Sequence, residues 1–227
     1  MKTNILLNIG CGMTPTKGFE NYDNSFSLKL SRYPLFSAIL YKLQLISKAQ
    51  MDYIDFCKKN NIKWANAIKH IPQPNESASL LYTSHMLEHL DRAEAAFFLK
   101  EALRVLKPGG KIRLAVPDLS KVIEQYNQDK DADAFVESTL MCIPNPRSLF
   151  QKLRIGIIGN RHHLWMYDGN SLLKLLEKNG FTNAAVMLSG ETSINDLGSL
   201  DLSERSEEST YVEAVKPLIN DECKSGE

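Results

Sequence analysis

The sequence predicts an α/β fold, a three-layer sandwich built around a seven-stranded and mostly parallel sheet. Apolar runs of strand length alternate with amphipathic helical patterns, which is the element order of such a sheet. The first run, Ile5–Ile9, is largely apolar, as is typical of a strand buried on both faces. The last two predicted strands leave no room for a helix between them, so we expect them to pair antiparallel.

Bulk composition indicates one domain spanning residues 1–227. Lys plus Arg and Asp plus Glu both number 27, so the chain lacks the basic footprint of a nucleic-acid binder. The four cysteines form no C-x-x-C pair, which fits a reducing compartment. Since there is no secretory signal and no apolar run near ~18 residues, we expect a cytoplasmic protein without a membrane span.

A glycine turn follows the first strand. Gly10 and Gly12 lack a Cβ, so a ligand can lie against their backbone. Nucleotide-type ligands bind at the carboxyl ends of parallel strands, where an acid commonly holds the ribose hydroxyls. Asp23 ends the second predicted strand, Phe19–Asp23, and is the candidate acid. Its separation from the turn is much shorter than the ~20 residues of a dinucleotide site, so we expect no full helix between them. A simple turn is the alternative for the glycines and for Asp23.

A helical insertion is predicted over residues 25–61. Leu35, Ile39 and Leu43 recur at helical spacing, and basic residues outnumber acidic ones. We expect one or two amphipathic helices beside the ligand crevice, forming a lid or a substrate wall. A packing helix with a solvated basic face and a membrane-surface helix are the alternatives.

The middle of the chain carries the clearest helix. Ile62–Ala67 and Ala78–Ser84 are the third and fourth predicted strands. Asp91 and Glu94 then form a capping box at the start of an amphipathic helix. Lys111–Asp118 is the fifth strand.

The C-terminal part begins with a variable segment, about 119–166, whose pattern is ambiguous between helix and loop. Asp168 then caps a short helix that ends at Gly180. Asn183–Ser189 and Tyr211–Val215 are the sixth and seventh predicted strands.

Several stretches together resemble the class I S-adenosylmethionine-dependent methyltransferases, of the methyltransferase type 11 kind, which have a Rossmann-like fold. The matching stretches are LLNIGCG, the acid Asp23, SLLYTSHMLEHL, EALRVLKPGGKIRLAVPD and YVEAVK. The chain is similar in particular to small bacterial methyltransferases that often occur with cell-surface sugar genes. The resemblance covers most of the chain except residues 25–61 and 119–160.

The resemblance implies a cofactor, S-adenosylmethionine, and a set of residues around it. These residues are Gly10, Cys11, Gly12, Asp23, Asn66, Ser84 and His85. The glycine turn would contact the methionine part, and Asp23 would take the ribose hydroxyls. Asn66 stands where relatives usually carry Asp, and its amide oxygen can still accept from the adenine amino group. Ser84 and His85 would lie near the transferred methyl.

The function we expect is methyl transfer to a small-molecule acceptor, with a hydroxyl of a sugar or glycan precursor as the substrate implied by the resemblance. A hydroxyl nucleophile needs a base, and a positioned histidine can add ~10²–10⁴-fold to the rate. His85 is the first catalytic candidate. His162 and His163 are the second, if the loop carrying them folds back over the site. A structural or surface histidine is the alternative for each.

The stretch His85-Met-Leu-Glu88-His89 also spells H-x-x-E-H, a zinc-protease motif. We assign no metal ligand from it, because it falls between a strand and a helix where the methyltransferase pattern predicts it. A divalent ion at Glu88 and His89 remains an alternative, since some methyltransferases with a similar E-x-x-E-H stretch use one.

Two other functions compete with methyl transfer. An NAD(P)-dependent oxidoreductase shares the glycine turn and the ribose acid but expects G-x-G-x-x-G and a full helix, which this chain lacks. A methyltransferase-like domain that binds without catalysis is the third possibility. The sequence leaves open the acceptor atom and the oligomeric state.

Overall fold

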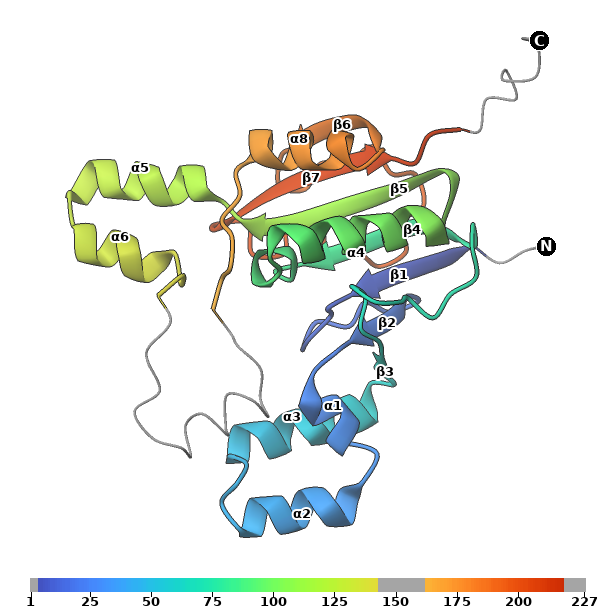
Figure 1. Cartoon of the computed structure of the whole chain (residues 1–227), viewed down its shortest axis with the longest axis vertical. Coiled ribbons are helices and arrows are strands. Elements are labelled where there is room, and N and C mark those ends of the chain that lie inside the picture. Colours follow the sequence, from blue (N-terminus) through green and yellow to red (C-terminus); the bar gives the residue numbers. More distant parts are fainter. Residues whose placement is uncertain (1–3, 143–161, 219–227) are drawn as a thin grey trace.

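The structure is a computed structural model that describes residues 4–142 and 162–218. Its seven strands form one sheet in the order β3-β2-β1-β4-β5-β7-β6 (Figure 1). The strands are β1 (Ile5–Ile9), β2 (Glu20–Asp23), β3 (Lys63–Trp64), β4 (Ala78–Ser84), β5 (Leu106–Pro117), β6 (Thr182–Met187) and β7 (Ser209–Val215). Neighbours are parallel except where β7 pairs with β5 and β6. The predicted sheet and its antiparallel last strand are confirmed.

The helices lie around this sheet. They are α1 (Phe26–Leu30), α2 (Pro34–Lys42), α3 (Lys48–Lys59), the 3-10 turn η1 (Leu87–His89), α4 (Arg92–Val105), α5 (Leu119–Asp129), α6 (Ala132–Ser138) and α8 (Gly169–Lys178). Within the described ranges, every helix is too short or too polar to cross a lipid bilayer.

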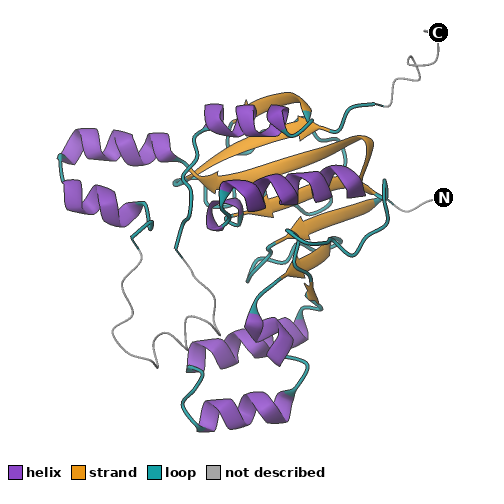
Figure 2. Cartoon of the chain, viewed as in Figure 1, coloured by secondary structure: helices purple, strands orange, loops and turns teal. Residues whose placement is uncertain are grey.

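Helices α4 and α8 cover one face of the sheet (Figure 2). Phe98 and Leu99 of α4 and Leu176 of α8 are fully buried against sheet residues such as Leu7 and Ile112. The predicted capping box forms at Asp91, and Asp168, which was predicted only as a cap, forms a second box with Ser171. Helix α4 follows β4, and α8 precedes β6, which is parallel to β4. Both helices therefore begin near the carboxyl edge of the parallel strands.

The segment between β6 and β7 covers the opposite face. Its residues Ile194 and Leu200 pack on Leu80 and Tyr82 of β4. Arg113 of β5 is fully buried and anchors the segment, because its guanidinium donates to the carbonyl oxygens of Glu191 and Leu202. The same guanidinium pairs with the Glu213 carboxylate at 2.5 Å. The layer on this part of the sheet is thus an irregular segment tied down by a buried ion pair.

Two strands differ from their predicted limits by more than two residues at one end. β3 is only Lys63–Trp64, shorter than predicted, because the chain turns at Asn66, whose carbonyl accepts from the backbone N–H of Lys69. β5 starts at Leu106 rather than at Lys111, and a register shift against β4 absorbs the extra residues.

The insertion forms three helices where the sequence predicted one or two. Figure 1 shows α1, α2 and α3 grouped beyond β3. Ile54 of α3 is fully buried, whereas Leu35 and Ile39 of α2 are 82% and 54% exposed. The helical period of α2 was therefore predicted correctly, but Leu35 and Ile39 do not face a core.

The variable segment contains α5 and α6, which project from the end of β5 in Figure 1. Tyr126 and Phe135 join the two helices, with ring centroids 5.3 Å apart. Residues 143–161 of this segment lie outside the described residues.

Candidate active site at the carboxyl edge of the sheet

The glycine turn lies where β1 ends. The backbone N–H groups of Gly10 and Cys11 both donate to the carbonyl of Tyr22 in β2. Gly10 has φ +71°, and a Cβ there would lie 2.6 Å from Cγ of Met86. Gly12 has φ +50°, and a Cβ there would meet nothing within 4 Å. Gly10 is thus required for packing against the residue after His85, whereas Gly12 borders open space.

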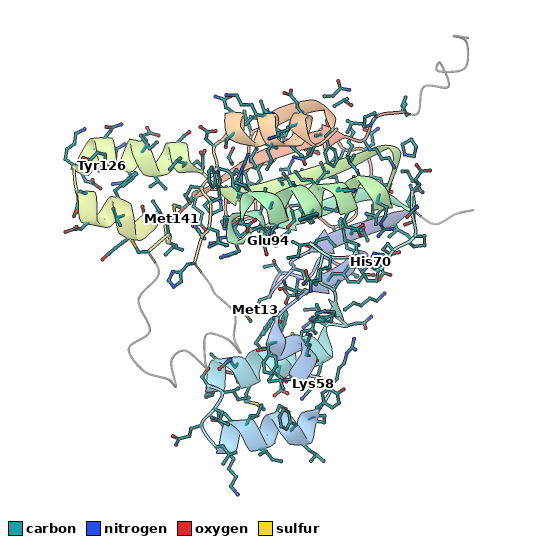
Figure 3. All side chains as sticks on the ribbon, in the orientation of Figure 1. Met13, Lys58, His70, Glu94, Tyr126 and Met141 are labelled. Carbon is teal, nitrogen blue, oxygen red and sulfur yellow. The ribbon has the colours of Figure 1, made fainter. Side chains whose placement is uncertain are left out.

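Asp23 lies directly against this turn. Its Oδ2 accepts from the N–H of Gly12 at 3.2 Å, and its Oδ1 accepts from the N–H of Ser25 at 2.7 Å. The described link between Gly12 and β2 forms turns and no helix, as predicted, so the acid reaches the turn without an intervening element. Met13, labelled in Figure 3, is 64% exposed and lies between the end of the sheet and α1–α3 in this view.

Helix α3 of the insertion touches the turn. The hydroxyl of Tyr53 donates to the carbonyl of Gly12 at 3.4 Å. The Cys11 side chain is buried with Leu28 and Cys57, and burial raises the pKa of its thiol. The insertion therefore does lie beside the turn, and only the backbone of Cys11 can face a ligand.

Several buried polar atoms at this edge lack a hydrogen-bond partner among the described residues. Two of them are Oδ1 of Asn66, just after β3, and Oγ of Ser84, the last residue of β4. Leaving such atoms unpaired costs ~1–3 kcal/mol each, so a polar ligand that pairs with them gains that energy back. An adenosyl ligand offers a suitable donor in its adenine amino group. The residues present therefore fit the implied cofactor.

His85 adopts a left-handed backbone, with φ +49°. This conformation is costly for a residue with a side chain and is concentrated at functional sites. Its Nε2 lies 2.8 Å from Oγ of Ser209 in β7, and its Nδ1 lies 3.5 Å from Oε1 of Glu88. Burial lowers the pKa of His85 to about 4, and the positive charge of Arg205 adds to this effect. The imidazole is therefore neutral near pH 7.

Glu88 and His163 come together although they are distant in the sequence. The backbone N–H groups of Leu164 and Trp165 donate to the carbonyl of Glu88, which docks the 163–165 segment on η1. His163 is buried, and its ring lies edge-on to that of His89 at 5.2 Å between centroids. Burial raises the pKa of Glu88 to about 7.

The structure thus separates the two histidines predicted as second candidates. His163 points its side chain into the Glu88 cluster, whereas His162 contributes its carbonyl oxygen, which lies 3.1 Å from Nδ1 of His89. Sequence reasoning did not include Ser209 or Met86 among the site residues, because nothing in their local sequence distinguishes them.

Comparison with known proteins gives three results. The family model described as a methyltransferase domain matches residues 4–186. A solved S-adenosylmethionine-dependent methyltransferase from Methanosarcina mazei is 17% identical, with a TM-score of 0.51 over 96% of this chain and 94% of that chain. Another from Thermotoga maritima, described as a possible histamine N-methyltransferase, is 14% identical, with a TM-score of 0.49 over 95% and 84%. No sequence among the curated proteins matches. At 17% identity the Methanosarcina mazei structure bears on the fold alone.

Proposed function

Because the chain belongs to the class I S-adenosylmethionine-dependent methyltransferases, as the family match over residues 4–186 shows, we propose that it methylates a small-molecule acceptor. The part of this proposal that concerns the cofactor depends on one observation. It is the buried, unpaired Oδ1 of Asn66 on the same sheet edge as the Asp23 carboxylate. These two acceptors match the two ends of an adenosine, the amino group and the ribose hydroxyls. A hydroxyl of a sugar or glycan precursor is the acceptor that we favour, and this choice depends on the family resemblance alone.

The residues of this chain would mainly orient the cofactor and the acceptor. S-adenosylmethionine, when bound, supplies a methyl group already activated on a sulfonium. Gly12 would leave room for the methionine part, Asp23 would hold the ribose and Asn66 the adenine amino group. Ser84 and His85, at the end of β4, would border the acceptor side. Holding reactants in line can contribute about 7–11 kcal/mol, so orientation alone accounts for a large share of the rate.

We assign His85 the role of the general base that takes the proton from a hydroxyl acceptor. Its imidazole is neutral near pH 7, which is the state that a base needs, but a pKa of about 4 makes it a weak one. The Glu88 carboxylate, 3.5 Å from Nδ1, would stabilise the imidazolium once it forms. A His85→Gln variant with the wild-type rate of methyl transfer would contradict this role of His85. A catalytic role for the His162 side chain stays a prediction.

The family membership favours methyl transfer over the oxidoreductase alternative. The turns between Gly12 and Asp23 support the same choice, because a dinucleotide site uses a full helix there. The remaining alternative, a methyltransferase-like domain that binds without catalysis, is distinguished from an enzyme by measuring methylation.

A thermal-shift panel with S-adenosylmethionine, S-adenosylhomocysteine, NAD and NADP tests the cofactor. A ligand at 100 times its Kd stabilises by about 2.7 kcal/mol, or roughly 5–10 °C for a chain of this size. We expect a shift with the two adenosyl ligands only, and a shift with NAD instead would overturn the proposal. A mass-spectrometric screen of sugars, nucleotide-linked sugars, protein and RNA then tests the acceptor. Methylation of protein or RNA alone would contradict a small-molecule substrate, and no methylation at all would favour a binding domain.

A further inference from the structure

The Glu88 carboxylate is the most unusual group outside the proposed cofactor contacts. The residue is 1% exposed, and neither carboxylate oxygen has a hydrogen-bond partner within residues 4–142 and 162–218. A buried carboxylate without hydrogen bonds is strongly disfavoured unless a cation or a proton accompanies it. Among the residues that the structure describes, the basic groups within 4 Å of this carboxylate are the imidazoles of His85 and His89, and no Lys or Arg side chain comes that close.

Two histidines converge on this carboxylate. One ligand atom each from Glu88, His89 and His163 lie within 4.8 Å of one another. Nε2 of His89 lies 3.9 Å from Oε1 of Glu88. Two ligands of a tetrahedral Zn²⁺, each about 2.0–2.2 Å from the ion, lie roughly 3.3–3.6 Å apart. The widest separation in the cluster would therefore close by about 1 Å when an ion binds.

The outer contacts of both rings orient a nitrogen toward the centre of the cluster. Nδ1 of His89 lies 3.1 Å from the carbonyl of His162, so we assign it the ring proton. Nδ1 of His163 lies 3.4 Å from Sδ of Met166, which is also an acceptor only. On the His89 ring Nε2, which lies 3.9 Å from Oε1 of Glu88, then carries the lone pair. A histidine that donates its other N–H to a carbonyl is the usual arrangement at protein metal sites.

The backbone fixes the third ligand in place. The N–H of His163 donates to the carbonyl of Leu140, and those of Leu164 and Trp165 donate to the carbonyl of Glu88. The side chain of His163 thus reaches Glu88 from a segment that is hydrogen-bonded on both sides. Ligands held on fixed backbone lose little entropy when an ion binds.

We propose that Glu88, His89 and His163 bind one divalent transition cation. Two imidazole nitrogens and one carboxylate oxygen suit Zn²⁺ and its first-row neighbours, whereas Mg²⁺ and Ca²⁺ prefer oxygen ligands. Three protein ligands leave a further coordination position for water or for an oxygen of a substrate. The proposal gives His163 the role of a ligand instead of a base, and it adds a ligand to the pair that the sequence left as an alternative. It does not depend on methyl transfer.

Metal binding is measured directly on the full-length, untagged protein without any cofactor. Protein stripped with EDTA is titrated calorimetrically with Zn²⁺, and bound metal is counted by inductively coupled plasma mass spectrometry after dialysis. We expect one Zn²⁺ per chain and no heat with Mg²⁺. Glu88→Gln and His163→Gln, which keep the side-chain volume similar, should each weaken Zn²⁺ binding by more than ~100-fold, since removing only an outer contact costs 10–100-fold.

His70→Ala is the matched control. This histidine is exposed and contacts Glu101 rather than the cluster, so its loss should leave Zn²⁺ binding unchanged. Circular dichroism establishes that each variant is folded, and if one is not, the other of the two cluster variants carries the test. No Zn²⁺ binding by the wild type would overturn the proposal. So would binding that persists in folded Glu88→Gln or His163→Gln, because the ion would then lie elsewhere. Binding of the cofactor is tested separately, with adenosyl ligands.

Discussion

The site has two halves that are built in different ways. The glycine half consists of Gly10, Gly12, Asp23 and Asn66 at the ends of β1, β2 and β3. The histidine half consists of His85, Glu88, His89 and His163 after β4. In the glycine half, Gly12 donates to Asp23 only 11 positions away, and parallel strand pairing brings the residues after β3 to the same edge. The histidine half joins residues 73 positions apart, as the contact between His89 and the His162 carbonyl shows.

The two halves also differ in charge. Asp23 is the one acid of the glycine half, and backbone N–H groups satisfy both of its oxygens. The histidine half buries an acid and two imidazoles, and burial raises the pKa of Glu88 to about 7 while lowering that of His85 to about 4. The first half thus offers oxygen acceptors to the hydroxyl and amino groups of a ligand, and the second responds to pH and to cations. Met86 connects them, because it follows His85 and packs on Gly10.

The largest expected effect concerns the packing between the halves. Gly10→Ala should lower the free energy of unfolding by about 2–5 kcal/mol, from left-handed strain of roughly 1–2 kcal/mol and overpacking of roughly 1–3 kcal/mol against Met86. Gly12→Ala is the matched control, since it has a similar positive φ but open space around the new Cβ. It should cost only the strain. Urea unfolding measures both, and equal losses would show that Met86 does not bear on Gly10.

The next effect is the pH dependence of the metal-free protein. The pKa of Glu88 rises on folding from 4.5 to about 7, so its favourable contribution is complete below pH 4.5 and is lost as pH rises through 7. The loss amounts to about 3 kcal/mol. His85 has the opposite sign, because its pKa falls from 6.5 to about 4 and its contribution is lost as pH falls.

Comparison with Glu88→Gln separates these contributions. In EDTA, the difference in unfolding free energy between this variant and the wild type should grow between pH 4.5 and 7 in favour of the variant. Zn²⁺ should remove the difference by restoring the wild type. A difference that does not change with pH would mean that Glu88 is solvated in solution rather than buried beside the histidines.

The smallest expected effect is on the affinity of the glycine half for the cofactor. Asn66→Ala removes one hydrogen bond to the adenine amino group, which is worth about 0.5–1.5 kcal/mol, or roughly 2- to 13-fold in Kd for S-adenosylhomocysteine. An analogue with hydrogen in place of the 6-amino group should bind both proteins equally. Equal weakening with both ligands would show that Asn66 acts on the fold rather than on adenine.

The contrast between the halves also explains what the sequence could predict. Asp23 could be placed beside the glycine turn, because parallel strands bring their carboxyl ends to one edge and the link is short. The helix that follows η1 was predictable from Asp91 and Glu94, since a capping box is a local arrangement. The division of the chain into one domain with a lid stays a prediction.

The docking of His163 on Glu88 was not predictable in this way. It depends on backbone hydrogen bonds between η1 and a distant segment, and no sequence period specifies that register. The H-x-x-E-H stretch indicated two of the three ligands, but the third became identifiable only with the tertiary structure. The exposed apolar residues of α2 differ from expectation for a similar reason, because periodicity predicts a helix and not what covers it.

The most direct test of a divided site is the Kd of S-adenosylhomocysteine for two variants, measured by calorimetry beside the wild type. Asp23→Ala removes charged hydrogen bonds worth about 1.5–3 kcal/mol, so we predict that it weakens binding by roughly 10- to 150-fold. Glu88→Gln should change the same Kd less than about threefold, within the scatter of near-neutral substitutions. If Asp23→Ala bound the ligand as tightly as the wild type, or if both variants lost affinity equally, the cofactor would not lie in the glycine half.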